Sequence, residues 1–286
     1  MKAAVSSTFS IIVIPLFLTR PVAGGRLFNA LHEDIRVVVP DLGSNDSVVM
    51  LSAYSDQEWV RLHPEDARKL NVEAVGQLCD LVISTGAHFV FLSSEAVFGK
   101  DRQEGWEESA FPCPVTEYGR QKAEAEDLLG KHGNRCIVRT GWNVGWEYAD
   151  RCIIKATYEL LLGGKAQMAT DNILTLTNVH DTSRALIEIC VRQVQGVIHL
   201  VSTTPIVRSR LADFVIASSK FGAAMSYAAV KYADRSFQEY RPRQAWLRVT
   251  DVSIPYCGDF DTPQSIVTRK VGILDAIHED NLYTHN

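Results

Sequence analysis

Short apolar runs alternate with segments of helical periodicity through the first half of the chain. Residues 89–92 are apolar on both faces, as a strand in the middle of a parallel sheet is expected to be. Within residues 64–85, apolar side chains such as Leu70, Leu78 and Leu81 recur at roughly helical spacing. This alternation predicts an α/β fold, a Rossmann-like doubly wound parallel sheet with helices on both faces.

The same patterns predict the other elements. We expect the first strand at residues 10–14, a helix at 25–32 and a second strand at 35–39. Further strands are expected at 47–51 and 136–139, and a further helix at 117–131. After about residue 142 the alternation of strand and helix patterns becomes less regular, which predicts a smaller lobe over the sheet edge. Its expected elements are helices at 153–162, 179–191 and 209–220, a strand at 197–200, and a mostly irregular segment from Tyr240 onward.

Length and composition limit the classes of function. With 286 residues and 46% hydrophobic content, the chain can form one large domain or a main domain with a smaller lobe. The net charge of -5 and the lack of a long Lys/Arg run argue against nucleic acid or an anionic membrane surface as partner. The six cysteines are scattered without metal-ligand spacing, so we expect no metal site and reduced cysteines in a cytoplasmic protein.

The N-terminal segment has two interpretations. Lys2, the apolar run at 11–18 and the small residues near Gly24 have the order of a secretion signal. The run is too short to span a bilayer as a helix. We favour the interpretation that it contributes the first strand of the sheet.

Tyr118 and Lys122 are four residues apart and lie on the same side of a predicted helix. An ammonium group near a phenol favours the phenolate, so the tyrosine could pass a proton near neutral pH. The predicted strand at 89–92 leads into two hydroxyl side chains, Ser93 and Ser94, upstream of this pair. A hydroxyl, a phenol and an ammonium from two predicted elements are therefore expected near one edge of the sheet.

A strand-end serine followed by a helical tyrosine and lysine resembles the short-chain dehydrogenase/reductase superfamily. More narrowly, the chain is similar to the dTDP-4-dehydrorhamnose reductase family. The family pattern S-T-D-Y-V-F-D-G resembles residues 93–99, and its Y-G-x-x-K resembles 118–122. Other family patterns resemble residues 52–55, 69–72, 139–145, 196–200 and 241–247, all in the expected order.

The resemblance implies roles for individual residues. Tyr118 would protonate the substrate carbonyl as hydride arrives, Lys122 would lower its pKa, and Ser94 would hydrogen-bond the carbonyl oxygen. These are the expected catalytic residues. The expected substrate-binding residues are Ser94, Glu95, Trp142, Arg241 and Arg243.

The resemblance also implies NAD or NADP as cofactor, bound mainly by residues 1–145. Residues 146–286 would then be mostly a small C-terminal substrate lobe, with some segments returning to the sheet. The glycine-rich loop expected after the first strand is reduced to Gly24 and Gly25, and the first domain is truncated near 40–47. The expected cofactor-binding residues are Gly24, Gly25, Asp41, Ser52, Ala53, Tyr54, Asn71, Tyr118 and Lys122.

The resulting functional prediction is an NAD(P)-dependent oxidoreductase acting on the 4-keto group of a nucleotide-activated deoxysugar. An epimerase or dehydratase on the same fold is an alternative, because Glu95 places a carboxyl group beside Ser94. A non-catalytic regulatory subunit is the other alternative, since the regulatory subunit of methionine adenosyltransferase resembles the same family. Homodimers are common in the superfamily, so a homodimer is included among the expectations.

Overall fold

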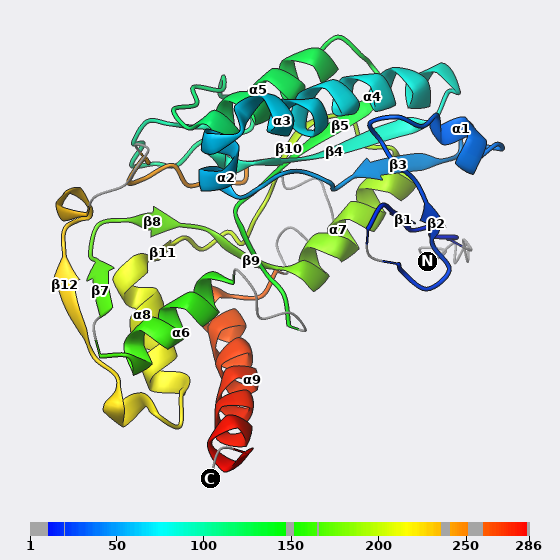
Figure 1. Cartoon of the computed structure of the whole chain (residues 1–286). Helices are drawn as coiled ribbons and strands as arrows, with labels where there is room; N and C mark the ends of the chain where they lie inside the picture. Colours follow the sequence, from blue (N-terminus) through cyan, green and yellow to red (C-terminus); the bar gives the residue numbers. More distant parts are fainter. Residues whose placement is uncertain are drawn as a thin grey trace, which may run out of the picture.

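A computed structural model describes residues 11–19, 21–146, 152–164, 166–235, 241–250 and 260–284. Four parallel strands form its central sheet in the order β10-β5-β4-β3 (Figure 1). Their bounds are β3 Ser47–Met50, β4 His88–Ser94, β5 Arg135–Thr140 and β10 Gly196–Leu200. The α/β prediction with a parallel sheet is confirmed, as are the strands expected around 47–51, 89–92, 136–139 and 197–200.

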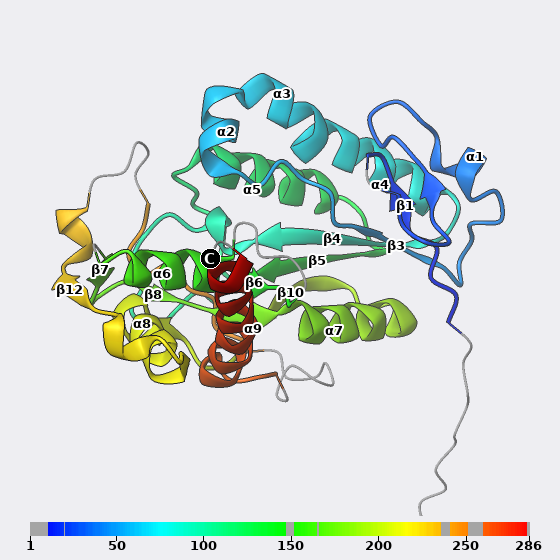
Figure 2. The same ribbon diagram turned by 60° about the horizontal axis from the view of Figure 1, so that its bottom comes forward.

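Helices cover both faces of this sheet (Figures 1 and 2). One face carries the helices between β3 and β5, and the other carries α7. The helix expected at 64–85 is confirmed as a continuous run with a π-helical turn at Lys69–Ala74. The helix bounds are α2 Gln57–Leu62, α3 Pro64–Arg68, α4 Val75–Ser84, α5 Glu117–Leu129 and α7 Val179–Arg192.

Alternate side chains of β4 fill two separate cores. Phe89 and Phe91 pack in a cluster with residues of α4 and α5, whereas Val90 packs with residues of α7. All three side chains are fully buried. The double-sided apolar pattern of this strand thus reflects helices on both faces, as the sequence predicts.

The N-terminal segment differs from its prediction. Residues 11–15 form no strand, and β1 (Leu16–Phe17) pairs instead with β2 (Arg26–Leu27) in a separate two-stranded parallel sheet. The predicted strand at 35–39 is a short helix, α1 (Ile35–Val38). Its first turn is capped by Asp34, whose carboxylate accepts a hydrogen bond from the Arg36 backbone N–H. The predictions for 11–14, 25–32 and 35–39 are therefore wrong, and Ser10 lies outside the described residues.

These corrections leave β3 at the edge of the sheet. No strand in the described part of the chain pairs with its outer side. In both ribbon views β1, β2 and α1 lie at one end of the sheet, whereas α2, which follows the carboxyl end of β3, lies at the other (Figures 1 and 2). The N-terminal segment that contains β1, β2 and α1 thus lies away from the carboxyl ends of the strands, where α/β proteins bind their ligands.

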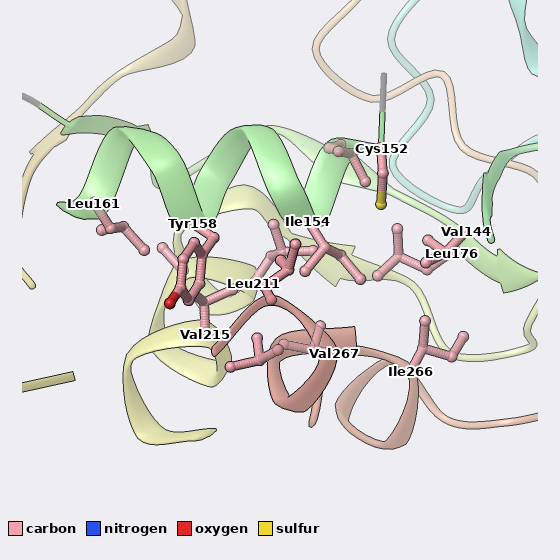
Figure 3. Close-up of a cluster of buried hydrophobic side chains, with 14 of the residues drawn as sticks. Val144, Cys152, Ile154, Tyr158, Leu161, Leu176, Leu211, Val215, Ile266 and Val267 are labelled. Carbon is pink, nitrogen blue, oxygen red and sulfur yellow. The ribbon is translucent and has the colours of Figure 1, made fainter. Parts of the chain in front are cut away.

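The second half of the chain builds a lobe beside the sheet. Its short strands pair as β7 (Ala166–Ala169) with β12 (Tyr227–Val230), β8 (Ile173–Leu174) with β11 (Ile206–Val207), and β6 (Trp142–Val144) with β9 (Leu176–Asn178). Its helices α6 (Ile153–Leu162), α8 (Arg208–Ser218) and α9 (Pro263–Thr284) share one hydrophobic core (Figure 3). Helices expected near 153–162, 179–191 and 209–220 are confirmed.

Helix α9 corrects the expectation of a mostly irregular end. It runs for 22 residues, and its side chains Ile266, Val267, Val271 and Leu274 are buried in the lobe core. Their spacings of one, four and three residues are those of a helical stripe, so the signal was present in the sequence. Among the described residues, no helix combines the length and apolarity needed to cross a membrane.

Candidate active site

The end of β4 brings Ser94 against the start of α5. Ser94 caps a 3₁₀ turn (Glu95–Val97), and its Oγ accepts a hydrogen bond of 3.2 Å from the Ala96 N–H. The Ser94 side chain also interacts with the Tyr118 hydroxyl and acts to lower the pKa of this phenol. A Cβ on Gly119 would lie 2.1 Å from the Ala96 carbonyl oxygen, so only glycine allows α5 to approach this closely. Two hydroxyls from separate elements therefore meet in one place.

Lys122 lies one turn further along α5 and is almost completely buried. Its Nζ donates a 2.9 Å hydrogen bond to the Leu92 carbonyl and lies 4.4 Å from the centre of the Phe91 ring. Burial lowers the pKa of Lys122 to about 7, and the negative charge of Glu126 acts in the opposite direction. The ammonium is 6.0 Å from the centre of the Tyr118 ring.

The pKa of Tyr118 moves opposite to the prediction. Burial raises it to about 12, and only the hydrogen bond from Ser94 opposes this shift. Lys122 does not lower it, because its Nζ is directed to the Leu92 carbonyl rather than to the phenol oxygen. Tyr118 is therefore a neutral O–H donor at neutral pH, which is the form that can protonate a carbonyl oxygen.

These groups line a cavity of about 720 Å³ between the carboxyl ends of the sheet strands and the lobe. Such a volume suits a ligand of nucleotide-sugar size. The sheet side contributes Ser94, Glu95, Tyr118, Lys122 and Trp142, all predicted from the sequence. The lobe side contributes three arginines, Arg208, Arg235 and Arg241.

Of these arginines the sequence predicted only Arg241. Burial, followed by repulsion from Arg235, lowers the pKa of Arg208 to about 10. A bound anion would relieve this repulsion, because guanidinium groups bind phosphate oxygens in pairs. The predicted Arg243 does not line the cavity; its side chain forms ion pairs with Asp101 and Asp171. Only tertiary packing brings Arg208 and Arg235 to the site, so the sequence carried no local signal for them.

The donors around the Glu95 carboxyl group are uncharged. Thr175 Oγ1 donates to its Oε2 at 3.4 Å, and the Trp142 side chain donates a second hydrogen bond. Burial outweighs both contacts and raises the pKa of Glu95 to about 8. Its carboxyl is thus largely protonated at pH 7 and faces the same cavity as Ser94.

Hydrogen bonds from Asn71 fix the loop that follows β3. The Asn71 side chain exchanges hydrogen bonds with the Tyr54 backbone, accepting from N–H at 2.9 Å and donating to the carbonyl at 3.1 Å. It also donates to Gln121 on α5, a residue that the sequence reasoning missed. Ala53 lines the cavity, whereas Ser52 and Tyr54 do not. Asn71 is therefore a positioning residue for this loop.

Gly24, Gly25 and Asp41 are not brought to the cavity. Gly24 and Gly25 form the turn between β1 and β2, and a Cβ on Gly25 would lie 2.9 Å from the Pro15 and Val22 carbonyl oxygens. Asp41 lies in the turn before the amino end of β3. These residues lie away from the cavity because β1 and β2 form a small separate sheet and residues 35–38 form a helix, whereas strands of the central sheet were expected there.

The site therefore accommodates one end of a dinucleotide. Tyr118, Lys122 and the loop at Ala53 border the place where a nicotinamide riboside would meet a carbonyl at Ser94. Within the described ranges, no glycine-rich turn leads into any of the helices that begin at this cavity, so the usual binding site for the diphosphate is not found there. The described residues that line the cavity fit the nicotinamide end of NAD(P). They include no matching binding site for its adenosine end.

A serine, a tyrosine and a lysine gathered at the carboxyl edge of a parallel sheet define the carbonyl site of the short-chain dehydrogenase/reductase class. The family model described as RmlD substrate binding domain matches residues 31–262, and the chain belongs to this family. The match starts at residue 31, within the N-terminal segment in which the fold departs from its prediction. The resemblance inferred from the sequence is thereby confirmed.

Individual proteins support the same placement. A probable low-salt glycan biosynthesis reductase of Haloferax volcanii is 24% identical over 245 residues, covering 82% of this chain and 78% of the relative. A dTDP-4-dehydrorhamnose reductase of Sinorhizobium fredii is 24% identical over 243 residues, covering 82% and 72%. The structure of a dTDP-4-dehydrorhamnose reductase from Bacillus anthracis in complex with NADP superposes with a TM-score of 0.71 at 20% identity, covering 82% of each chain.

Proposed function

We propose that this chain is an NAD(P)-dependent oxidoreductase that reduces the 4-keto group of a nucleotide-activated deoxysugar. The observation that carries the proposal is that Ser94 and Tyr118 line, side by side, a cavity that also holds three arginines. Two hydroxyls suit a carbonyl oxygen, and the arginines suit a diphosphate. The names of the reductases to which the chain is similar support this substrate class.

In this mechanism the substrate carbonyl oxygen lies between the two hydroxyls. Ser94 orients the carbonyl, and Tyr118 gives it a proton as the oxygen becomes negative. Bound NAD(P)H supplies hydride to the carbonyl carbon. Because burial disfavours the phenolate, Tyr118 is driven to regain a proton after the transfer.

The lobe side of the cavity would bind the rest of the substrate. Arg208, Arg235 and Arg241 would pair with the diphosphate, and Trp142 would contact the sugar. This assigns residues 146–286 mostly to substrate binding, as the sequence predicts. The homodimer and the cytoplasmic location stay predictions.

The proposal is tested by mixing the purified chain with dTDP-4-dehydrorhamnose and NADH or NADPH and following cofactor oxidation by absorbance. Replacing the phenol in Tyr118→Phe is expected to lower kcat by about 10²–10⁴-fold, because the proton donor is lost. Affinity for dTDP should stay unchanged, since the arginines are intact. A variant as active as the parent chain, or a parent chain without reductase activity on this substrate, would contradict the proposal.

A further inference from the structure

Glu95 has no role in the reduction described above, yet it occupies the same cavity. It follows Ser94 directly in the chain, and both side chains line the pocket. Its carboxyl group is fixed by Thr175 and Trp142. Gly141 leaves room for it, since a Cβ on that residue would lie 3.2 Å from Glu95 Oε2. The carboxyl is thus held in place in the cavity that Ser94 and Tyr118 also line.

A purely structural acceptor at this place need not be an acid. The two groups that donate to Glu95 are a hydroxyl and an indole, and a glutamine oxygen could accept from both. What glutamine cannot provide is a group that takes up and releases a proton. Burial, with no cation among the causes of its shift, gives Glu95 a pKa of about 8. That value makes its carboxylate a much stronger base than an ordinary surface carboxylate.

The other charged and titratable groups around the cavity are compatible with such a base. Tyr118 and Lys122 face it from α5, and Arg208, Arg235 and Arg241 face it from the lobe. Tyr118 remains protonated throughout the range in which Glu95 titrates, because its pKa is about 12. A base and an acid are therefore available together near neutral pH.

We propose that Glu95 is a general base that removes the proton from a carbon adjacent to the bound keto group. The C–H electron pair forms the new C=C bond, the carbonyl π pair moves to oxygen, and that oxygen takes the proton of Tyr118. The products of this step are an enol, a protonated Glu95 and a Tyr118 phenolate. Reversal returns a proton to carbon, so the step is redox-neutral and exchanges or epimerises that carbon.

This inference rests on the proposed function for its substrate class, a 4-keto nucleotide sugar, and is independent of the nicotinamide cofactor. A cofactor-independent step suits this cavity. Ser94 and Tyr118 line it, but the described residues show no glycine-rich turn there for the adenosine end of a dinucleotide. The chain could therefore process a keto sugar even when it carries no NAD(P)H.

The test is hydrogen exchange in D₂O. The chain is incubated with dTDP-4-dehydrorhamnose without NAD(P)H, and loss of the proton signals beside the keto group is followed by NMR. We expect exchange above the protein-free rate, rising about tenfold per pH unit up to about pH 8 and then levelling. Glu95→Gln should lower this rate by about 10²-fold or more. Asp66→Asn, at an exposed ion pair on α3, is the matched control and should leave the rate unchanged.

Calorimetric binding of dTDP by the parent chain and by Glu95→Gln separates the outcomes. Binding by both, with exchange only in the parent chain, supports the proposal. Binding by both with equal exchange, or with no exchange above background, overturns the role of Glu95 and leaves the proposed reductase function standing. Failure of the parent chain to bind dTDP or the keto sugar overturns both the inference and the proposed function.

Discussion

Glu95 is a carboxyl group whose ionisation opposes folding. Its pKa in the folded chain is about 8, above the ordinary value of 4.5, so the folded state binds more protons than the unfolded state between these pH values. The contribution of Glu95 to stability is therefore fully present below pH 4.5 and is lost as pH rises to about 8. A neutral, isosteric amide at this position would not undergo this loss.

Glu95→Gln should accordingly change the pH dependence of thermal unfolding. Near pH 4.5 the variant and the parent chain should have similar Tm values, because Glu95 is neutral in the folded state. At pH 8.5 the variant should be more stable by on the order of 1 kcal/mol or more, which is about 2–4 °C in Tm. Scanning calorimetry at both pH values measures this difference. An equal Tm difference at the two pH values would contradict the assigned environment of Glu95.

At the same scale, the sequence predicted residues whose positions follow from one element. Ser94, Tyr118 and Lys122 could be found because a strand end and a helical spacing fix where their side chains lie. Arg208 and Arg235 could not, because they reach the cavity only through the packing of the lobe. The pKa of Tyr118 was mispredicted for a similar reason, since the direction of the Lys122 side chain depends on the Leu92 carbonyl.

Between elements, the approach of α5 to the turn after β4 depends on a single missing side chain. In Gly119→Ala, the new Cβ would clash with the Ala96 carbonyl oxygen at 2.1 Å, so α5 must move away from the turn. We expect a loss of about 1–3 kcal/mol of stability and separation of the hydroxyls of Tyr118 and Ser94. Denaturant unfolding and dTDP-sugar reduction measure the two effects.

Gly272→Ala is the matched control for this substitution. Gly272 lies within α9, and nothing lies within 4 Å of an added Cβ there. Because alanine favours helix over glycine by about 1 kcal/mol, this variant should be as stable as the parent chain or more stable. Equal destabilisation by both substitutions would show that the close approach at Gly119 is not the cause.

A buried ion pair joins α5 to β5. The Arg139 guanidinium donates to the Glu126 carboxylate at 2.7 Å, and Ser93 donates to the same carboxylate at 2.6 Å. The side chains of Glu126 and Arg139 are 5% and 3% exposed, so neither charge can be solvated if its partner is lost. This pair anchors the strand end that carries Ser94.

Glu126→Gln should therefore destabilise the chain by about 3–5 kcal/mol, because it leaves the Arg139 charge buried without a counter-charge. Asp66→Asn removes the partner of an ion pair whose side chains are 58% and 63% exposed, and it should cost at most about 1 kcal/mol. Urea unfolding of the two variants gives the comparison. A similar loss of stability in both variants would mean that burial does not determine how strongly the Glu126–Arg139 ion pair stabilises the chain.

Short N-terminal elements were the part of the fold that the sequence predicted worst. The run at 35–39 is apolar enough for a strand, but the carboxylate of Asp34 caps the N–H of Arg36 and starts a helical turn there. Within the described residues the run at 11–14 has no partner strand, and pairing begins only where the carbonyls of Pro15 and Phe17 accept hydrogen bonds from the N–H groups of Arg26 and Phe28. Strand formation requires a neighbour, and a single sequence does not disclose whether one exists.

For the whole molecule, the central sheet ends at β3 on the side where a doubly wound fold places its first mononucleotide-binding half. Ser94, Tyr118 and Lys122 line the cavity, while Gly24, Gly25 and Asp41 lie away from it. The adenosine diphosphate part of NAD(P)H should therefore contribute little to binding by this chain.

This asymmetry predicts the affinities of two cofactor forms. Reduced nicotinamide mononucleotide and NADPH should bind with dissociation constants within about tenfold of each other, a difference of at most about 1.4 kcal/mol. Quenching of protein fluorescence during titration measures both. The NADP-binding reductase of Bacillus anthracis, carried through the same titrations, should prefer NADPH strongly and serves as the reference. Binding of NADPH to this chain about 100-fold tighter than the mononucleotide would mean that a cradle for the adenosine end exists.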